Sequence, residues 1–567
     1  MGTWHDLVII GAGWYGLGAA KPYIEVHRDH RVLVIEAAGS CGGTWSADRL
    51  YPGLKSNNLR GSYEFPDFPM SQDVYGVAEG EHIPAAVLHR YLTDFARAFN
   101  ILERTQFHTK VTCVTQLESG GWELTVQPSS PGATSSNDTI RTRKLIVATG
   151  LTSEPNLPRY NGQETFTPWL FHAKDFCKHA HTVDTSKRAA VVGAGKSSFD
   201  CAYAFASAGA HVDLIIRPTG QGPVWICPPY VTPFRCKMEA LLTTRALTWF
   251  SPCPWGDDDG YSVVRRFLHG TAIGRFLVEI FWHMLSADVV ATHGYHDHPQ
   301  LFKLKPWQNA MWTGSGVGIH NYSTNFFDLV RDGKVRVHIA DIACLDGDTV
   351  VLTDGERLPV DVLVCATGWK KGGGVPFPNF DLGLSSGYSD VEQERMAEEA
   401  DAAVRDEFPM LKAQPVLRTT SSSPPKTQPL RNYRFMVPAG AVAQRDLAFA
   451  GMVSTVCTAS FATAQGLWIT AFFDGSLTRA PKSQEDVAKE ILCHTQFQKW
   501  RYPCGYGASI PDFAFDSIPY VDLLLKDLGL RNHRKASPMV EMVESYGPAD
   551  YKGLTQEWLE TQRELGV

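Results

Sequence analysis

Two glycine-rich turns, each preceded by a short apolar run, constrain the fold of this 567-residue chain more than any other feature. The first, Gly11-Ala12-Gly13-Trp14-Tyr15-Gly16, follows the apolar run 7–10, and the second, Gly193-Ala194-Gly195-Lys196-Ser197-Ser198, follows 189–192. In such a turn the first glycine allows a tight bend, the second lets the backbone approach a pyrophosphate, and the third packs helix against strand. Ser198 stands at the third position of the second turn and is small enough for that packing. Two such units predict two dinucleotide cofactors and therefore redox chemistry.

The residue that ends the next strand differs in charge between the two units. Glu36 ends the run 32–35, 20 residues after Gly16, where a carboxylate accepts hydrogen bonds from ribose hydroxyls and repels a 2′-phosphate. The first unit is therefore expected to hold the adenosine of FAD or NAD. Arg217 follows the run 212–216 at the matching place, where a guanidinium binds a 2′-phosphate. We predict NADPH there, with Lys196 adding charge near a phosphate; the alternative is that Arg217 pairs with a surface carboxylate.

The pattern along the chain is typical of an α/β protein. Short apolar runs alternate with stretches of helical periodicity, as in parallel sheets covered by helices. Residues 111–147 instead predict a small antiparallel meander. Residues 238–250 and 261–285 predict helices within 222–330, a region that interrupts the second unit. The expected architecture is two dinucleotide-binding (Rossmann-like) domains with parallel sheets, a small antiparallel meander and a helical insertion.

Composition and charge argue against several other classes of protein. The formal net charge of −7 argues against a nucleic-acid partner. The 12 cysteines are scattered without a C-x-x-C pair, which is typical of reduced thiols in an intracellular, cytoplasmic protein, and no metal is expected. No signal peptide is evident. The long apolar stretch 271–290 contains Arg275, Glu279 and Asp288, so it predicts a packed helix or one at a membrane surface, but not a membrane span.

The residues after the first turn resemble the class B flavin-dependent monooxygenases, the family of flavin-containing and Baeyer–Villiger monooxygenases. The motif E-x5-G-G-x-W of that family's FAD site is matched by Glu36, Gly42, Gly43 and Trp45. Two A-T-G motifs, at 148–150 and 366–368, match those where the family's chain leaves and re-enters the FAD domain. The resemblance implies a cofactor site for FAD. Its predicted residues are Gly11, Gly13, Trp14, Gly16, Glu36, Gly43, Thr44, Trp45, Ser56, Asn57, Val111 and Gln465, with a helix-surface amide as the alternative for Gln465.

The same resemblance predicts how the chain is divided. Residues 1–160 are expected to form the first segment of the FAD-binding domain, and 161–370 the NADPH-binding domain with the insertion. Residues 371–567 are expected to complete the FAD domain and add a C-terminal extension. The insertion either shapes a substrate cavity or serves packing alone.

Two further residues are predicted to take part in the reaction. His172 matches the histidine of the family's F-x-G-x-x-x-H fingerprint, with Pro168 in place of glycine, and would couple NADPH binding to domain movement. A structural histidine is the alternative. Asn57 follows Tyr51-Pro52-Gly53, where Baeyer–Villiger members usually carry Asp and N- and S-oxygenating members carry Asn. A neutral amide beside the flavin favours N- or S-oxygenation or hydroxylation; a turn-forming Asn is the alternative.

The resemblance implies an NADPH-consuming FAD monooxygenase that inserts one atom of O₂ through a flavin C4a-(hydro)peroxide. The cofactor carries the chemistry and the protein orients it. The tryptophans and apolar helices of 222–330 favour a bulky, apolar organic substrate, such as a secondary metabolite. Baeyer–Villiger oxidation of a ketone stays open. A disulfide reductase would need a reactive cysteine pair, which Cys41 lacks, and a non-catalytic redox sensor is the remaining alternative.

Overall fold

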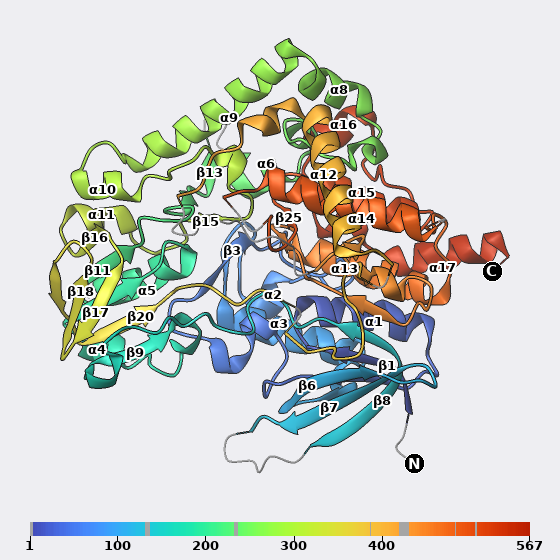
Figure 1. The fold of residues 1–567 in the computed structure, drawn as a ribbon, viewed down its shortest axis with the longest axis horizontal. Helices are drawn as coiled ribbons and strands as arrows, with labels where there is room; N and C mark the ends of the chain where they lie inside the picture. Colours follow the sequence, from blue (N-terminus) through green and yellow to red (C-terminus); the bar gives the residue numbers. More distant parts are fainter. Residues whose placement is uncertain are drawn as a thin grey trace.

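The computed structural model describes residues 4–130, 137–231, 236–372, 374–385, 387–418, 430–481, 483–504 and 507–566. Two large sheets lie in different parts of the molecule, one at the lower right and one at the left of Figure 1. The first has the order β5-β2-β1-β8-β7-β6, with β23 also paired to β8. Its strands are β1 (Trp4–Ile10), β2 (Val32–Ile35), β5 (Thr105–Gln106), β6 (Thr109–Gln116), β7 (Trp122–Pro128), β8 (Asp138–Val147) and β23 (Leu447–Phe449).

Strand β8 joins the predicted meander to the parallel sheet. One of its edges pairs in parallel with β1 over 141–147. Its other edge pairs with β7 in antiparallel fashion over 138–142 and then with β23 in parallel over 145–147. The meander that the sequence predicts is therefore continuous with the parallel sheet rather than separate from it. Strand β23 brings residues more than 400 positions from the N-terminus into the sheet that carries the first glycine turn.

The second sheet is parallel throughout and has the order β16-β11-β10-β20-β9. Its central strands are apolar and buried on both faces. In β20, for example, all four residues are buried. One face packs against helices that include α5 (Lys196–Ser207). The other face is covered not by helices, as the sequence pattern predicted, but by the small antiparallel sheet of β17 (Ile342–Asp346), β18 (Thr349–Leu352) and β19 (Arg357–Pro359). The strands are β9 (Trp169–His172), β10 (Arg188–Val192), β11 (His211–Ile216), β16 (Val335–Ile339) and β20 (Val362–Cys365).

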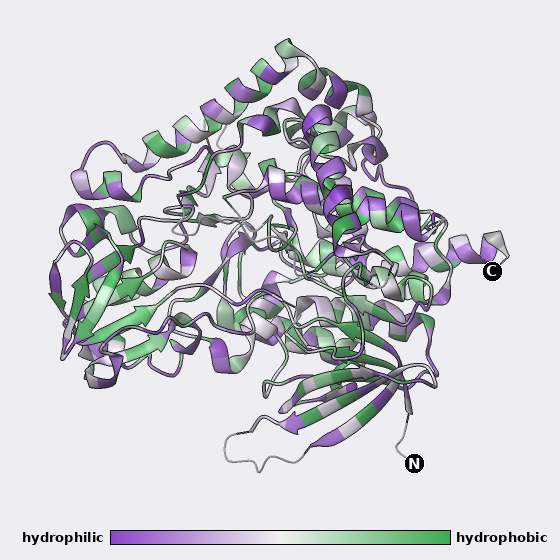
Figure 2. Cartoon of the chain, viewed as in Figure 1, coloured by the Kyte–Doolittle hydropathy of each residue, from purple (hydrophilic) through white to green (hydrophobic). Residues whose placement is uncertain are grey.

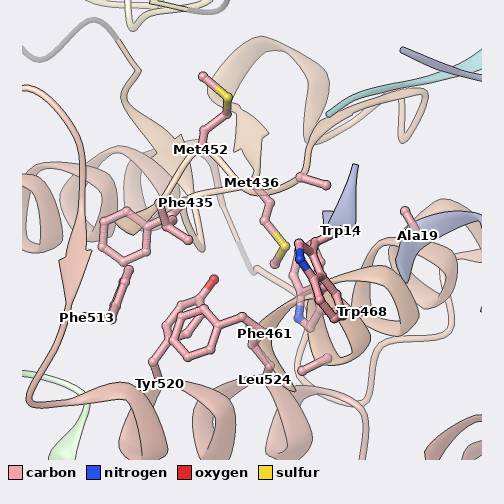
Figure 3. Close-up of a cluster of buried hydrophobic side chains, with 14 of the residues drawn as sticks. Trp14, Ala19, Phe435, Met436, Met452, Phe461, Trp468, Phe513, Tyr520 and Leu524 are labelled. Atoms are coloured by element: carbon pink, nitrogen blue, oxygen red, sulfur yellow. The ribbon is translucent and has the colours of Figure 1, made fainter. Parts of the chain in front are cut away.

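Helix α1 (Trp14–Val26), which follows the first turn, packs closely against α13 (Thr458–Asp474). The contact depends on glycine, because a Cβ on Gly466 would lie 2.1 Å from the carbonyl oxygen of Gly18. Beyond α13 the core is aromatic, and Figure 3 shows Phe461, Phe513 and Tyr520 turned toward one another. The centroids of the Phe513 and Tyr520 rings are 4.3 Å apart. This core ties the C-terminal third of the chain to the first glycine turn.

The predicted insertion is helical, and its two ends are joined by the parallel pair β12 (Trp225–Cys227) and β15 (Val317–Ile319). The prediction of helices in 238–250 and 261–285 is confirmed, with breaks that the apolar pattern did not show. The helices are α6 (Met238–Leu242), α7 (Arg245–Thr248), α8 (Ser262–Gly270), α9 (Ala272–His293), α10 (Pro299–Leu304) and α11 (Phe326–Arg331). Other helices are α3 (Ala85–Ala98), α5 (Lys196–Ser207), α12 (Asp390–Glu407), α14 (Gln484–Arg501), α15 (Ser517–Asp527), α17 (Leu554–Leu565) and the short α16 (Pro538–Val543).

Helix α9 runs along the upper edge of the molecule and is apolar on two sides, as its green segments in Figure 2 indicate. Val278 and Trp282 face the protein and are buried, whereas Ile273 is 69% and Met284 66% exposed. The sequence-based expectation of a packed helix therefore holds for the inner face of α9 only. Among the described residues, no helix combines the length and apolarity needed to cross a membrane.

The insertion packs against the C-terminal part of the chain through buried ion pairs. Arg245 of α7 is fully buried and donates to the carboxylates of Asp522 on α15 and Glu541 on α16. Its second bond to Asp522, from Nη2 to Oδ1, is 3.0 Å long. Because removing one partner of such a cluster leaves a buried charge uncompensated, these bonds fix the insertion to α15 and α16.

Candidate dinucleotide and active site

The first glycine turn has backbone geometry that only glycine allows at two positions. Gly11 has φ +107°, and a Cβ there would lie 2.4 Å from the carbonyl oxygen of Ala148. A Cβ on Gly16 would lie 1.8 Å from the carbonyl oxygen of Gly11. Helix α1 begins directly after Gly13 and has no side-chain cap. Its first N–H groups are therefore available to an anion, as a pyrophosphate site requires.

Glu36, directly after β2, is held under this turn. Its carboxylate accepts hydrogen bonds from the N–H groups of Ala12, at 2.7 Å, and Ala38, at 2.8 Å. Burial raises the pKa of Glu36, and these two bonds oppose the rise. Each carboxylate oxygen has lone pairs beyond the one used, so the group can still accept a bond from a ribose hydroxyl.

The residues of the flavin-type motif lie against the first turn. The N–H of Gly42 donates to the carbonyl of Ala12 at 2.9 Å, and a Cβ on Gly43 would lie 3.2 Å from the Cα of Gly13. Beyond them the Nε1 of Trp45 donates to the hydroxyl of Tyr63 at 3.2 Å. The ring of Tyr63 in turn lies 4.6 Å, centroid to centroid, from Trp14. The motif is therefore next to the helix N-terminus where FAD is predicted.

The second glycine turn repeats the geometry of the first. Gly193 has φ +144°, and a Cβ there would lie 2.3 Å from the carbonyl oxygen of Ala366. Thus the alanine of each A-T-G motif, Ala148 or Ala366, packs on the first glycine of one turn. Among the described residues, a Cβ on Gly195 would meet no heavy atom within 4 Å. Ser198 is buried, and its hydroxyl donates to the carbonyl of Gly195 at 2.6 Å.

The two predicted cations of the second turn differ in their surroundings. Arg217, directly after β11, is exposed, and the ion pairs among the described residues do not include it. Its guanidinium is therefore accessible to a phosphate. Lys196 begins α5, but its Nζ donates to Asp200, Asn321 and Tyr322 at 2.5, 2.9 and 3.1 Å. The ammonium thus bonds within the protein rather than pointing into open space, whereas Ser197 beside it is exposed.

His172 lies where the chain passes between the two sheets. Its Nδ1 accepts from the N–H of Lys174 at 3.1 Å, so its Nε2 carries the proton and donates to the carbonyl of Gly368 at 2.9 Å. The same carbonyl accepts from the N–H of Asn156 at 3.0 Å. Burial lowers the pKa of His172 and so favours the neutral imidazole. The histidine therefore joins β9 to the two chain crossings at 150–156 and 366–369.

Arg49 and Thr44 connect these crossings to the flavin-type motif. The guanidinium of Arg49 lies 5.0 Å from the centroid of the Trp369 ring and donates to the carbonyl of Thr152 at 3.0 Å. The hydroxyl of Thr44 lies 3.0 Å from that of Thr152. Arg49, the last residue of the 3-10 helix Ala47–Arg49, could not be identified from the sequence, because a single arginine without periodic neighbours carries no signal of a tertiary contact.

Asn57 lies in β3 (Lys55–Leu59), half-buried, and its amide takes part in none of the hydrogen bonds found among the described residues. Its neighbours are bonded on both sides. The hydroxyl of Ser56 accepts from the N–H of Ile83 on β4 (His82–Pro84) at 2.9 Å. The side chain of Asn58 donates to Glu239 of α6 at 2.6 Å. Sequence reasoning missed Glu239 because it lies about 180 residues away in the insertion.

The last two predicted FAD contacts are buried. Val111 lies in β6, where the pairing with β7 shifts register after it. Gln465 of α13 is fully buried: its Oε1 accepts from the N–H of Gly451 at 3.0 Å, and its Nε2 donates to the hydroxyl of Tyr520 at 3.1 Å. Gln465 is therefore not a helix-surface amide. A cavity of about 560 Å³ lies elsewhere, between residues such as Phe380, Leu384 and Phe472, and no predicted site residue lines it.

The donor set fits two dinucleotides. Each turn offers a helix N-terminus without a side-chain cap, at α1 and α5, together with glycines that keep the backbone accessible. Glu36 and Arg217 lie at equivalent places after the second strand of each unit. All 12 cysteines are free thiols in the structure.

Comparison with known proteins agrees with this geometry. A family model described as pyridine nucleotide-disulphide oxidoreductase matches residues 8–231, which include both turns. The chain is 32% identical over 586 residues, 98% of each chain, to the FAD-dependent monooxygenase rstn6 of Aspergillus nomiae. It is 32% identical to the FAD-dependent monooxygenase resA of Aspergillus sclerotiorum, over 99% of each chain. An open crystal structure of cyclohexanone monooxygenase shares the fold, with a TM-score of 0.60, 17% identity and coverage of 93% of this chain and 99% of that one.

Proposed function

The chain belongs to the FAD-dependent monooxygenases, and from this premise we propose that it uses NADPH and O₂ to oxygenate a small, apolar organic substrate. The observation that carries the proposal is the pair of opposite charges at equivalent places. The buried carboxylate of Glu36 suits the ribose hydroxyls of FAD, and the exposed guanidinium of Arg217 suits the 2′-phosphate of NADPH.

In the proposed reaction the residues of the chain bind the two cofactors, orient them and shield the reacting end of the flavin from water. FAD, when bound, supplies the capacity to accept a hydride and to activate O₂. The N–H groups at the start of α1 and α5 would hold the two pyrophosphates. The neutral amide of Asn57 would offer a hydrogen bond at the reacting end of the flavin without adding negative charge there. For this reason we propose N- or S-oxygenation or hydroxylation rather than ketone oxidation.

The reaction is tested with ¹⁸O₂ and mass spectrometry of the products. Purified holoenzyme with NADPH is offered sulfides, amines, aromatic polyketides and ketones. We expect products one ¹⁸O heavier from a bulky, apolar sulfide, amine or aromatic compound. Labelled esters formed from ketones would contradict N- or S-oxygenation and hydroxylation and would identify the reaction as Baeyer–Villiger oxidation. NADPH oxidation that releases only peroxide across all four classes would contradict the proposed substrate range.

The nucleotide assignment is tested with Arg217→Ala. Loss of a charge-assisted bond to a 2′-phosphate should raise the KM for NADPH about tenfold and leave the KM for NADH unchanged. Arg266→Ala is the matched control, because Arg266 on α8 is also exposed and distant from this turn in the chain. An unchanged ratio of the two KM values in Arg217→Ala would refute the assignment of NADPH to this site.

A further inference from the structure

Three side-chain contacts join the second dinucleotide turn to the strand that carries Asn57. Lys196, the first residue of α5, donates from Nζ to Oδ1 of Asn321 at 2.9 Å. Asn321, which follows β15, donates from Nδ2 to the carbonyl of Ser56 at 3.1 Å and lies 3.4 Å from that of Lys55. Three segments that are far apart in sequence therefore meet at the residue before Asn57.

The ammonium of Lys196 is committed to this network. Its other partners are Asp200, at 2.5 Å, and the hydroxyl of Tyr322, at 3.1 Å, and it lies 4.4 Å from the centroid of the Tyr322 ring. A lysine has three donors, so these three partners satisfy it. The side chain is 15% exposed, at the end of the helix where a pyrophosphate is expected. A phosphate there would add a competing negative charge beside the ammonium.

The other side of Asn57 is held by Glu239. Its carboxylate accepts from Nδ2 of Asn58 at 2.6 Å, from the N–H of Leu59 at 2.9 Å and from the hydroxyl of Ser62. Burial raises the pKa of Glu239, and these donors oppose the rise. Both neighbours of Asn57 are fixed, and its own amide has no hydrogen bond to the described residues. Asn57 therefore takes its position from the bonds of Ser56 and Asn58.

We infer that Asn321 is a positioning residue that couples occupation of the second dinucleotide site to the placement of Asn57 through Lys196. This inference rests on the proposed function of the two sites. A dinucleotide phosphate at the start of α5 changes the partners of Lys196, and Asn321 passes that change to the Ser56 carbonyl. Coupling of this kind is reciprocal: nucleotide binding changes the order of β3, and loss of the contact to β3 changes the effect of the nucleotide.

The coupling is measured by hydrogen–deuterium exchange of the holoenzyme with and without NADP⁺. In the wild type, NADP⁺ should slow exchange in the peptide 55–62 at least threefold. In Asn321→Leu and Lys196→Met the effect of NADP⁺ on this peptide should be lost. Ser323→Ala is the control, because Ser323 is on the same segment but contacts Tyr203, at 2.9 Å, rather than β3. If Asn321→Leu does not fold, Asn321→Asp keeps the shape and removes the donor to Ser56.

The kinetic consequence is measured separately. Asn321→Leu should release at least threefold more peroxide per NADPH oxidised, with the rate of flavin reduction within twofold of the wild type. Adding Lys196→Met to it should raise peroxide release no further, since both residues act through one contact. Equal NADP⁺ protection of 55–62 in wild type and Asn321→Leu, or multiplied effects in the double variant, would overturn the inference. If NADPH does not reduce the flavin of the wild-type enzyme, the proposed function itself is refuted.

Discussion

At the scale of single residues, the glycines of the two turns differ in what requires them. Gly16 is required by the protein itself, because its missing Cβ makes room for the carbonyl of Gly11. No described neighbour requires a glycine at position 195, since a Cβ there would meet no described atom within 4 Å. The φ of Gly195, −88°, is also accessible to every residue type. We propose that the room beside Gly195 serves the pyrophosphate of the second nucleotide.

Substituting these glycines should separate folding from binding. Gly195→Ala should leave the Tm unchanged and raise the KM for NADPH about tenfold, because a methyl group enters the path of the pyrophosphate. Gly16→Ala should lower the Tm and the retention of FAD, since its Cβ would lie 1.8 Å from a carbonyl oxygen. Gly270→Ala, also in open space, is the control for Gly195→Ala. An unchanged KM in Gly195→Ala would show that no nucleotide approaches this turn.

Two buried carboxyls make the folding stability of the protein depend on pH. Burial raises the pKa of Asp516 to about 7 and that of Asp512 to about 6. A carboxyl whose pKa is higher in the folded than in the unfolded state takes up a proton on folding. The stability it contributes is complete below the unfolded pKa of about 4 and is lost as the pH rises through the folded pKa.

Asp516→Asn should remove part of the dependence of stability on pH. The amide stays neutral, so the Tm of the variant minus that of the wild type should increase between about pH 5 and about pH 8. Differential scanning fluorimetry across this range measures the difference. Asp184→Asn, at an exposed position, should show a constant difference. A constant difference in Asp516→Asn as well would mean that Asp516 is ionised throughout.

At the scale of elements, the insertion is held by charge as well as by apolar packing. Arg245 of α7 is buried between Asp522 of α15 and Glu541 of α16, and its guanidinium also faces the ring of Tyr546 at 4.8 Å. In sequence the insertion lies between β11 and β16, two strands of the second sheet. In the folded protein the contacts of Arg245 attach it to the C-terminal helices α15 and α16. The insertion therefore connects the part of the chain that carries the second glycine turn to the C-terminal helices.

Arg245→Met should destabilise the protein strongly. The substitution leaves two buried carboxylates without a cation, which costs about 3–5 kcal/mol of unfolding free energy. Arg395→Met is the matched control: Arg395 pairs with Glu399 on the surface of α12, with 64% and 63% of the two side chains exposed, and its loss should cost less than about 1 kcal/mol. Chemical denaturation measures both. Equal losses would show that the buried cluster contributes no more than a surface pair.

At the scale of the whole molecule, the sequence predicted what depends on local patterns. Both glycine turns, the strands before them and the helices of the insertion have short-range signatures, and they are present. The continuity of β8 with both the meander and β23 could not be predicted, because the pairing partner at 447–449 is some 300 residues away. Glu239 and Asn321 were missed for the same reason, since only the folded chain brings them to β3.

We propose that the two turns bind different nucleotides and that NADPH at the second turn reduces the flavin held at the first. The most direct test is anaerobic stopped-flow reduction of the bound flavin, followed at the flavin absorbance band, with NADPH and NADH in parallel. We expect the purified protein to carry FAD, and NADPH to reduce this flavin about tenfold more efficiently than NADH does. Equal efficiency of the two nucleotides, or a protein that cannot be reconstituted with FAD, would contradict the proposal.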